Sequence, residues 1–105
     1  MMTHAKRTEV LAHATPVAVL ILVGNDNYGK PRQAFADKIA ALSDEGFAAE
    51  AEKRIWLSAY AHNNPRSDYH WQADACLDEA GRRGKPELYK HALAEAMGRC
   101  TVGLE

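Results

Sequence analysis

The chain lacks a long hydrophobic run, an excess of charge of either sign and a framework of cysteines. Its most apolar stretch, Val17 to Val23, is only seven residues long, whereas a membrane-spanning helix needs about 20. The 13 Lys and Arg residues nearly balance the 14 Asp and Glu residues, and the formal net charge is -1. This balance provides no general electrostatic attraction to nucleic acid. Two cysteines, Cys76 and Cys100, are too few for a disulfide-stabilised scaffold and indicate reduced, intracellular thiols.

The features of a secretion signal are incomplete. Lys6 and Arg7 precede an apolar run, as the charged region of a signal peptide would. Glu9 and His13 interrupt the approach to that run, and the residues after Val23 lack the small-residue pattern of a cleavage site. We therefore expect a cytoplasmic protein without a membrane segment.

Motifs of the common enzyme classes are absent as well. The sequence contains no Gly-x-Ser-x-Gly, no glycine-rich phosphate-binding loop and no Cys-x-x-Cys. The segment from Gly24 to Lys30 lacks the spacing of a phosphate-binding loop, and we interpret it as a connector. Cys76 falls in an apolar helical stripe, where a thiol is usually inert. We therefore expect no enzymatic activity and no cofactor.

Helix-forming residues are abundant. Ala, Leu, Glu, Lys and Arg dominate between boundaries marked by Pro, Gly, Ser and Asn, and this pattern favours helix. We expect an all-α fold, a compact bundle of about five or six short helices in a single domain over residues 1–105, with mobility confined to the ends at 1–8 and 99–105. The expected helices are Thr3–His13, Pro16–Val23, Pro31–Leu42, Asp44–Ala61, Asp68–Arg83 and Pro86–Gly98.

The segment from Val17 to Val23 has a second interpretation. Its Val and Ile content, followed by a Gly/Asn/Asp loop, also suits the first strand of an α/β fold. No later segment resembles a partner strand, so such a strand could pair only with its own copy in a homodimer. Thr15 as N-cap and Pro16 at the first helical position favour a short buried helix. The α/β fold with one short strand at 17–23 stays the alternative.

Two of the expected helices are apolar on more than one face. On the Asp44–Ala61 helix, Trp56 and Tyr60 lie about 120° from the main apolar stripe. On the Asp68–Arg83 helix, Trp71 points almost opposite to the main stripe. A helix of this kind is either central in a bundle or shared with a partner. The main stripes contain Phe47, Ala51, Ile55 and Ala59 on the first helix, Tyr69, Ala73, Cys76, Leu77 and Ala80 on the second, and Leu88, Tyr89, Ala92, Leu93, Ala96 and Met97 on the last helix.

Half of the eight aromatic residues fall within residues 56–71, interleaved with His, Asn and Arg. Trp, Tyr and Arg are enriched at interface hot spots, although large aromatics are also common in cores. We interpret the segment as a surface for a protein partner or for homodimerisation, with Tyr60, Asn63, Asn64, Arg66, His70 and Trp71 as its members. Trp71→Ala should then weaken association by about 2 kcal/mol or more and change stability little, whereas Trp56→Ala should mainly destabilise the fold.

A set of cations suggests an alternative function, a regulator that contacts nucleic acid. The helix after Gly84 carries Glu87 and Glu95 but only Lys90 as a cation, and its carboxylates repel phosphate. Nucleic-acid binding is therefore not favoured, although the sequence does not exclude it. The cations are Arg54, Arg66, Arg82, Arg83 and Lys85.

Histidines and carboxylates recur every fourth residue on the last two expected helices, a spacing that could assemble metal ligands. The helical wheel places both rows away from the apolar stripes, which favours solvated faces with local ion pairs. The rows are His70, Asp74 and Asp78, and Glu87, His91 and Glu95. A small-ligand or metal site near His62, His70 and Trp71 is the remaining alternative.

The sequence thus predicts a non-enzymatic helical protein that acts through protein–protein interaction. Its small size, its near-neutral charge and the absence of catalytic motifs are typical of an adaptor, inhibitor or accessory protein of a bacterium or mobile element. We recognise no family from its motifs.

Overall fold

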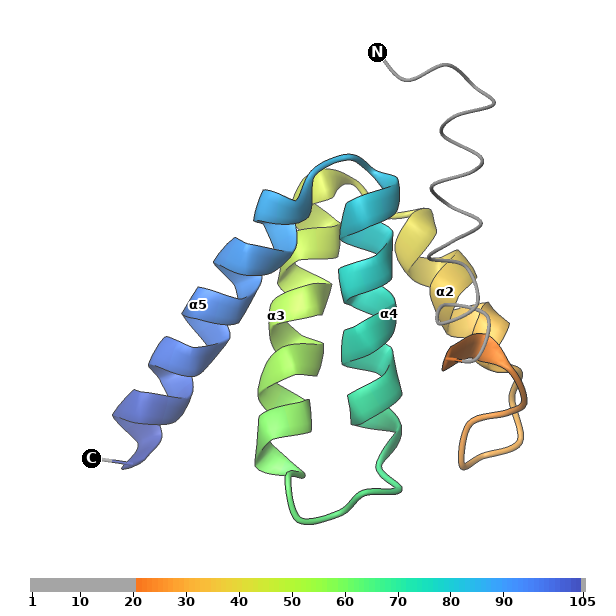
Figure 1. The fold of residues 1–105 in the computed structure, drawn as a ribbon, viewed down its shortest axis with the longest axis horizontal. Coiled ribbons are helices and arrows are strands. Elements are labelled where there is room, and N and C mark those ends of the chain that lie inside the picture. The colour runs from red at the N-terminus through yellow and green to blue at the C-terminus, as the bar shows by residue number, and fades with distance from the viewer. Residues whose placement is uncertain (1–20, 105) are drawn as a thin grey trace.

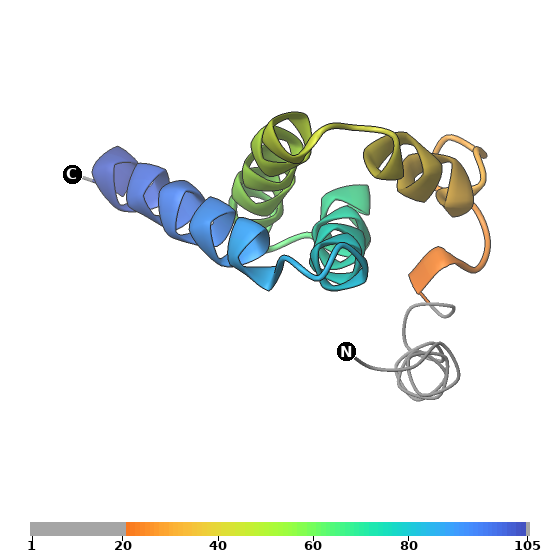
Figure 2. The same ribbon diagram turned by 90° about the horizontal axis from the view of Figure 1, so that it is seen from above.

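The computed structural model describes the backbone of residues 21–104 and the side chains of residues 21–98. Four helices are present in this part of the chain: α2 (Arg32–Ala40), α3 (Asp44–Tyr60), α4 (Asp68–Arg82) and α5 (Pro86–Leu104). The helices α3 and α4 form a central antiparallel hairpin, with α5 on one side and α2 on the other (Figure 1, Figure 2). Both α3 and α4 contact all three of the other helices. None of the described helices is long and apolar enough to cross a membrane.

Serine side chains and a glycine set the boundaries of the central helices. The Ser43 hydroxyl accepts a hydrogen bond from the backbone N–H of Gly46 at 3.1 Å and caps α3. The Ser67 hydroxyl accepts from the backbone N–H of Tyr69 at 3.2 Å and caps α4. Gly84 adopts a φ of 69°, the left-handed conformation that ends α4 and lets the chain turn into α5. The four helices expected between residues 31 and 98 are confirmed.

The number of helices differs from the expectation. The described residues contain four helices and not five or six. The helix expected at Thr3–His13 lies outside the described residues, as does most of the segment 17–23, for which we weighed helix against strand. The last helix continues beyond Gly98 to Leu104. A single glycine inside a helix costs only about 1 kcal/mol, and no proline follows it to stop the helix.

The core lies between α3 and α4 and is completed by α5. Up to Gly98, the buried residues of α5 are the small side chains Ala92 and Ala96, and their size allows α5 to approach the hairpin closely. The expected stripes are largely confirmed, but Leu77, Leu93 and Met97 are partly exposed. The buried core consists of Ile39, Phe47, Ala51, Ile55, Ala73, Ala75, Cys76, Ala80, Ala92 and Ala96, with Leu22, Phe35, Leu42, Trp56, Leu88 and Tyr89 packed around it.

The helix α4 buries two of its sides, which makes it central in the bundle. Trp71 is only 7% exposed, because the Phe35 ring packs against it edge to face with a centroid distance of 5.6 Å and the Arg32 guanidinium lies 4.9 Å from the centroid of its ring. Both of these residues belong to α2. The expectation that the Trp71 ring stays exposed or needs a partner subunit to cover it is therefore wrong. A helix about 35 residues earlier in the sequence covers it within the same chain.

Candidate interaction surface at the loop end

Two loops far apart in the sequence lie at the same end of the bundle, at the bottom of Figure 1. Residues 24–31 lead into α2, and residues 61–67 connect α3 to α4. The backbone N–H of Asn27 donates to both carboxylate oxygens of Asp68, at 3.2 and 3.1 Å. The Asn27 side-chain amide donates to the backbone carbonyl of Arg66 at 2.9 Å. These hydrogen bonds hold the two loops together in one surface, which we call the loop end.

The first loop contains a tight turn that presents Tyr28 to solvent. The Asp26 carboxylate accepts hydrogen bonds from the backbone N–H of Tyr28 at 2.8 Å and of Lys30 at 2.9 Å. Gly29 supplies the positive φ, 84°, that this turn requires. Tyr28 is 87% exposed, and the Asx-type hydrogen bonds fix its backbone without any contribution from the ring.

His70 fastens the second loop to α3. Its Nε2–H donates to the carbonyl oxygens of Asn64 at 2.9 Å and Ala61 at 3.1 Å. Its Nδ1 lies 2.6 Å from the Ser58 hydroxyl and accepts the proton of that hydroxyl. The polar atoms of His70 are therefore used within the fold, and the residue supports the loop.

The other predicted site residues are only partly brought together. Tyr60 is 73% exposed, and its ring stacks on Trp56 with a centroid distance of 5.6 Å. Asn63 and Arg66 are exposed on the second loop. The Asn64 side chain accepts from the backbone N–H of Arg66 at 3.1 Å and shapes that loop. Of the six predicted residues, Trp71 and His70 act inside the fold, and the remaining four lie at or beside the loop end.

A hollow of about 380 Å³ opens between the two loops and the α3–α4 hairpin. Arg54 lies in its wall and donates to Glu50 at 2.6 Å and to Gln72 at 3.0 Å. The charge of Arg54 is therefore already paired within the protein. The residues that line the hollow are Asp26, Asn27, Tyr28, Arg54, Asn64, Ser67, Asp68, Tyr69 and Gln72. The lining is more polar than that of most small-molecule sites.

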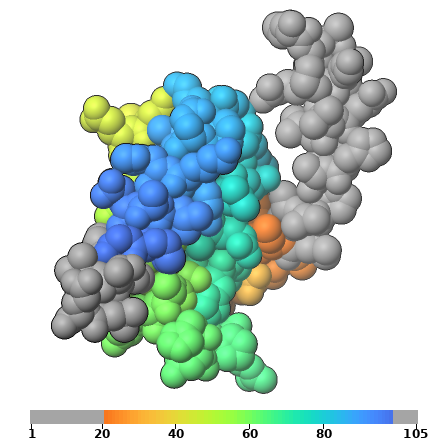
Figure 3. Space-filling model, turned by 60° about the vertical axis from the view of Figure 1, so that its left-hand side comes forward, coloured from red at the N-terminus to blue at the C-terminus, as the bar shows by residue number. Residues whose placement is uncertain are grey.

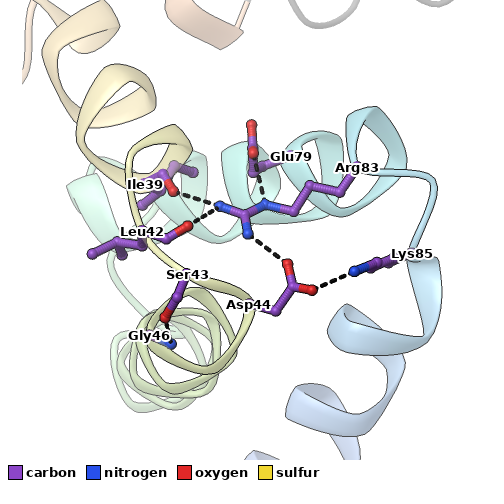
Figure 4. A network of polar contacts seen from close by, with 8 residues as sticks. All are labelled: Ile39, Leu42, Ser43, Asp44, Gly46, Glu79, Arg83 and Lys85. Carbon is purple, nitrogen blue, oxygen red and sulfur yellow. Dashed lines mark hydrogen bonds and ion pairs between the residues drawn. The ribbon is translucent and has the colours of Figure 1, made fainter.

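The opposite end of the bundle contains a different polar network, centred on Arg83 (Figure 4). The guanidinium group donates to Asp44 and Glu79, each at 2.8 Å, and to the carbonyl oxygens of Ile39 at 2.9 Å and Leu42 at 2.8 Å. We call this end the turn end, because it joins the α2–α3 turn to the α4–α5 turn. One largely enclosed guanidinium, on a side chain that is 14% exposed, thus satisfies carbonyls at and just beyond the end of α2 and the first acidic residue of α3.

The remaining cations that suggested nucleic-acid binding are also paired with carboxylates, apart from Arg66. Arg82 pairs with Asp78 at 3.1 Å, and Lys85 pairs with Asp44. Because these side chains neutralise acidic neighbours on the protein itself, they do not form a positive surface of the kind that phosphates require.

The histidine and carboxylate rows stay separate from one another. His91 lies 3.8 Å from Glu95 within α5, and His70 is engaged as described above. Among the described residues, no group of three His, Cys, Asp or Glu side chains is placed to hold a metal ion. Cys76 is fully buried, and burial raises the pKa of its thiol to about 12. This confirms the prediction that Cys76 belongs to the core.

Comparison of the chain with protein-family models, with curated proteins and with solved structures gives no match. The geometry of the described residues is therefore the basis for a functional proposal.

Residues 24–30 contribute to the loop end, whereas the sequence favoured a plain connector there. The sequence does contain a signal, because Asp26 followed by Gly29 is suited to an Asx turn with a left-handed residue. The contact of Asn27 with Asp68 could not be predicted, because the two residues come together only after α2, α3 and α4 have packed.

Proposed function

We propose that this protein is a non-enzymatic adaptor, inhibitor or accessory protein that binds a protein partner through the loop end. The observation that carries the proposal is the placement of Tyr28, an 87% exposed aromatic side chain on a turn that is held by hydrogen bonds. Tyrosine is among the residue types that contribute most to interface energies. A rigid turn loses little conformational entropy when a partner binds to it.

Among the described residues, no hydrogen bond that holds the turn uses the Tyr28 ring. The turn is stabilised by Asp26 and Gly29, and the link to the second loop is made by Asn27. A polar residue at position 28 would satisfy the same backbone geometry, which leaves the exposed aromatic ring available to a partner. Arg66 and Asn63, exposed on the adjoining loop, extend the same surface with side chains suited to polar contacts.

The other two candidate functions have less support. A nucleic-acid regulator would need free cations, and four of the five candidate cations pair with carboxylates. A small polar ligand is favoured only by the volume of the hollow, about 380 Å³, which falls within the range of small-molecule sites. A gel-shift titration at low salt and a thermal-shift screen with polar metabolites test these alternatives.

The proposal is tested by placing a photo-crosslinking amino acid at position 28 in the full-length protein in its native cell. Because Tyr28 is at the centre of the proposed surface, irradiation should give a discrete covalent adduct with one protein. The matched control carries the same amino acid at Lys53, which is exposed on the solvent side of α3. An adduct from position 28 alone supports the proposal.

Loss of the adduct on a second substitution, Arg66→Ala, would extend this support to the adjoining loop. The thermal stability of the Tyr28→Ala and Arg66→Ala variants should stay within about 0.5 kcal/mol of wild type, because both side chains are exposed. Adducts of equal yield from positions 28 and 53, or no adduct at position 28, would show that the loop end is not the partner surface.

A further inference from the structure

A second surface, distant from the loop end, carries partly exposed apolar side chains on α4 and α5. Leu77 of α4 is 52% exposed, and Leu93 and Met97 of α5 are each 39% exposed. Together with Tyr89 we call this surface the α4–α5 face. Leu93 and Met97 follow Tyr89 at intervals of four residues, so that the three side chains form one row on α5.

Tyr89 is the partly buried member of this face. Burial, followed by the nearby Asp74 and Cys76 groups, raises the pKa of the Tyr89 hydroxyl. Tyr89 itself is partly buried and packs against the core, and α4 and α5 contact each other. Leu77 and the α5 row therefore lie on two helices that pack against each other. Figure 3 shows α4 and α5 lying against each other on this side of the molecule.

Charges of opposite sign border the face. Asp74 precedes Leu77 by three residues on α4, and Lys90 precedes Leu93 by three residues on α5, so each charge shares a helix face with its apolar neighbour. Both side chains are exposed. Among residues 21–98 neither of them makes an ion pair. An acidic border and a basic border on one apolar face make that face complementary to itself.

We propose that a second copy of the chain binds to the α4–α5 face in a two-fold symmetric homodimer. In a symmetric pair each contact occurs twice, and Lys90 of one protomer meets Asp74 of the other. Leu77, Leu93 and Met97 of the two copies then cover one another. This inference does not rest on the proposed function, because the loop end and the α4–α5 face use different residues.

The first experiment is sedimentation velocity of the full-length protein over a concentration series. The wild-type mass should rise from 11.6 kDa towards twice that value as the concentration increases, with a Kd of about 1–100 µM for an interface of this modest size. Leu93→Asp should weaken the dimer about tenfold or more, because it places two carboxylates in the apolar contact. The matched control is Val23→Asp, an exposed apolar residue elsewhere, which should leave the dimer unchanged.

The second experiment uses charge exchange. Asp74→Lys alone and Lys90→Asp alone should each weaken self-association about tenfold or more, because each homodimer then contains two repulsive pairs. A mixture of the two variants should form a heterodimer, since both of its cross-subunit pairs are attractive. Both substitutions are at exposed positions, and circular dichroism verifies that each variant is folded.

A wild-type chain that stays monomeric over the whole series would overturn the proposal. Dimers that persist in Leu93→Asp and in both charge variants would overturn it equally, as would a mixture that does not associate. Tyr28→Ala should leave the dimer intact. If the photo-crosslinking amino acid at position 28 gives no adduct and the dimer is unchanged, the result counts against the proposed function and not against the α4–α5 face.

Discussion

The two ends of the helical bundle use polar side chains in different ways. At the turn end, Arg83 is enclosed by two carboxylates and two carbonyl oxygens, and its guanidinium also lies 4.6 Å above the ring of Phe47. At the loop end, Asp26 and Asp68 accept hydrogen bonds from neutral N–H groups. The turn end encloses the Arg83–Glu79 ion pair, whose side chains are 14% and 10% exposed, while the loop end leaves aromatic and amide side chains at the surface.

This difference indicates a division of roles between the two ends. Breaking a buried charged network leaves other charges unpaired, so the turn end contributes chiefly to stability. The hydrogen bonds of the loop end fix the shape of the backbone, and the exposed side chains attached to it contribute little to folding. A surface that is rigid but not needed for stability is suited to binding.

The largest effect that we expect concerns Trp71, which connects the loop end to the core. Trp71→Ala should lower the free energy of unfolding by about 3–5 kcal/mol, because it removes a buried ring and the partner of the Phe35 edge. This replaces the expectation from the sequence that the substitution mainly weakens association. Urea denaturation followed by circular dichroism provides the measurement. A loss below about 1 kcal/mol would mean that α2 does not cover the ring.

The next largest loss of stability that we expect follows a substitution at the turn end. Arg83→Met should cost about 3 kcal/mol, because it leaves the nearly buried Glu79 without its ionic partner and frees two helix-terminal carbonyls. The matched control is Arg82→Met, the neighbouring residue, whose half-exposed side chain pairs with Asp78. That variant should lose about 1 kcal/mol or less. Equal losses of unfolding free energy in the two variants would show that the Arg83 network stabilises the fold no more than a surface ion pair does.

The smallest effect concerns pH at the turn end. Hydrogen bonds from Lys85 and from Arg83 hold the pKa of the Asp44 carboxyl below its ordinary value of 3.8. A depressed pKa means that the ionised carboxylate stabilises the fold above pH 3.8 and that this contribution disappears as the pH falls through the lower, folded-state pKa. The stability difference between wild type and Asp44→Asn should therefore be constant near neutral pH and shrink in strong acid. Unfolding curves at several pH values measure it, and a difference that grows on acidification would contradict the assignment.

Local sequence signals predicted the helices because their causes are local. Ser43 and Ser67 cap the helices that follow them, and Gly84 adopts the left-handed conformation at the end of α4. The two-sided apolar pattern of α4 correctly indicated either a central helix or a shared one. The choice between these could not be made from the pattern, because it depends on whether another element of the chain covers Trp71.

The candidate site was predictable only in part for the same reason. Tyr60, Asn63 and Arg66 were found from the residue types that interfaces favour, and all three are exposed. His70 was included because it lies among the same aromatic and polar residues, but its ring donates hydrogen bonds to the carbonyl oxygens of Asn64 and Ala61. A residue type indicates what a side chain can bind, and only its neighbours in space decide whether that capacity is already used.

The amino-acid sequence by itself determined the helical class, most of the helix boundaries and the main apolar stripes, because these depend on backbone propensity, capping and spacing within a few residues. The tertiary structure decided that α2 covers Trp71, that Asn27 joins the first loop to Asp68, and that Leu77 and Leu93 stay exposed. Each of these outcomes depends on contacts between residues distant in the sequence, and such contacts exist only once the helices have packed.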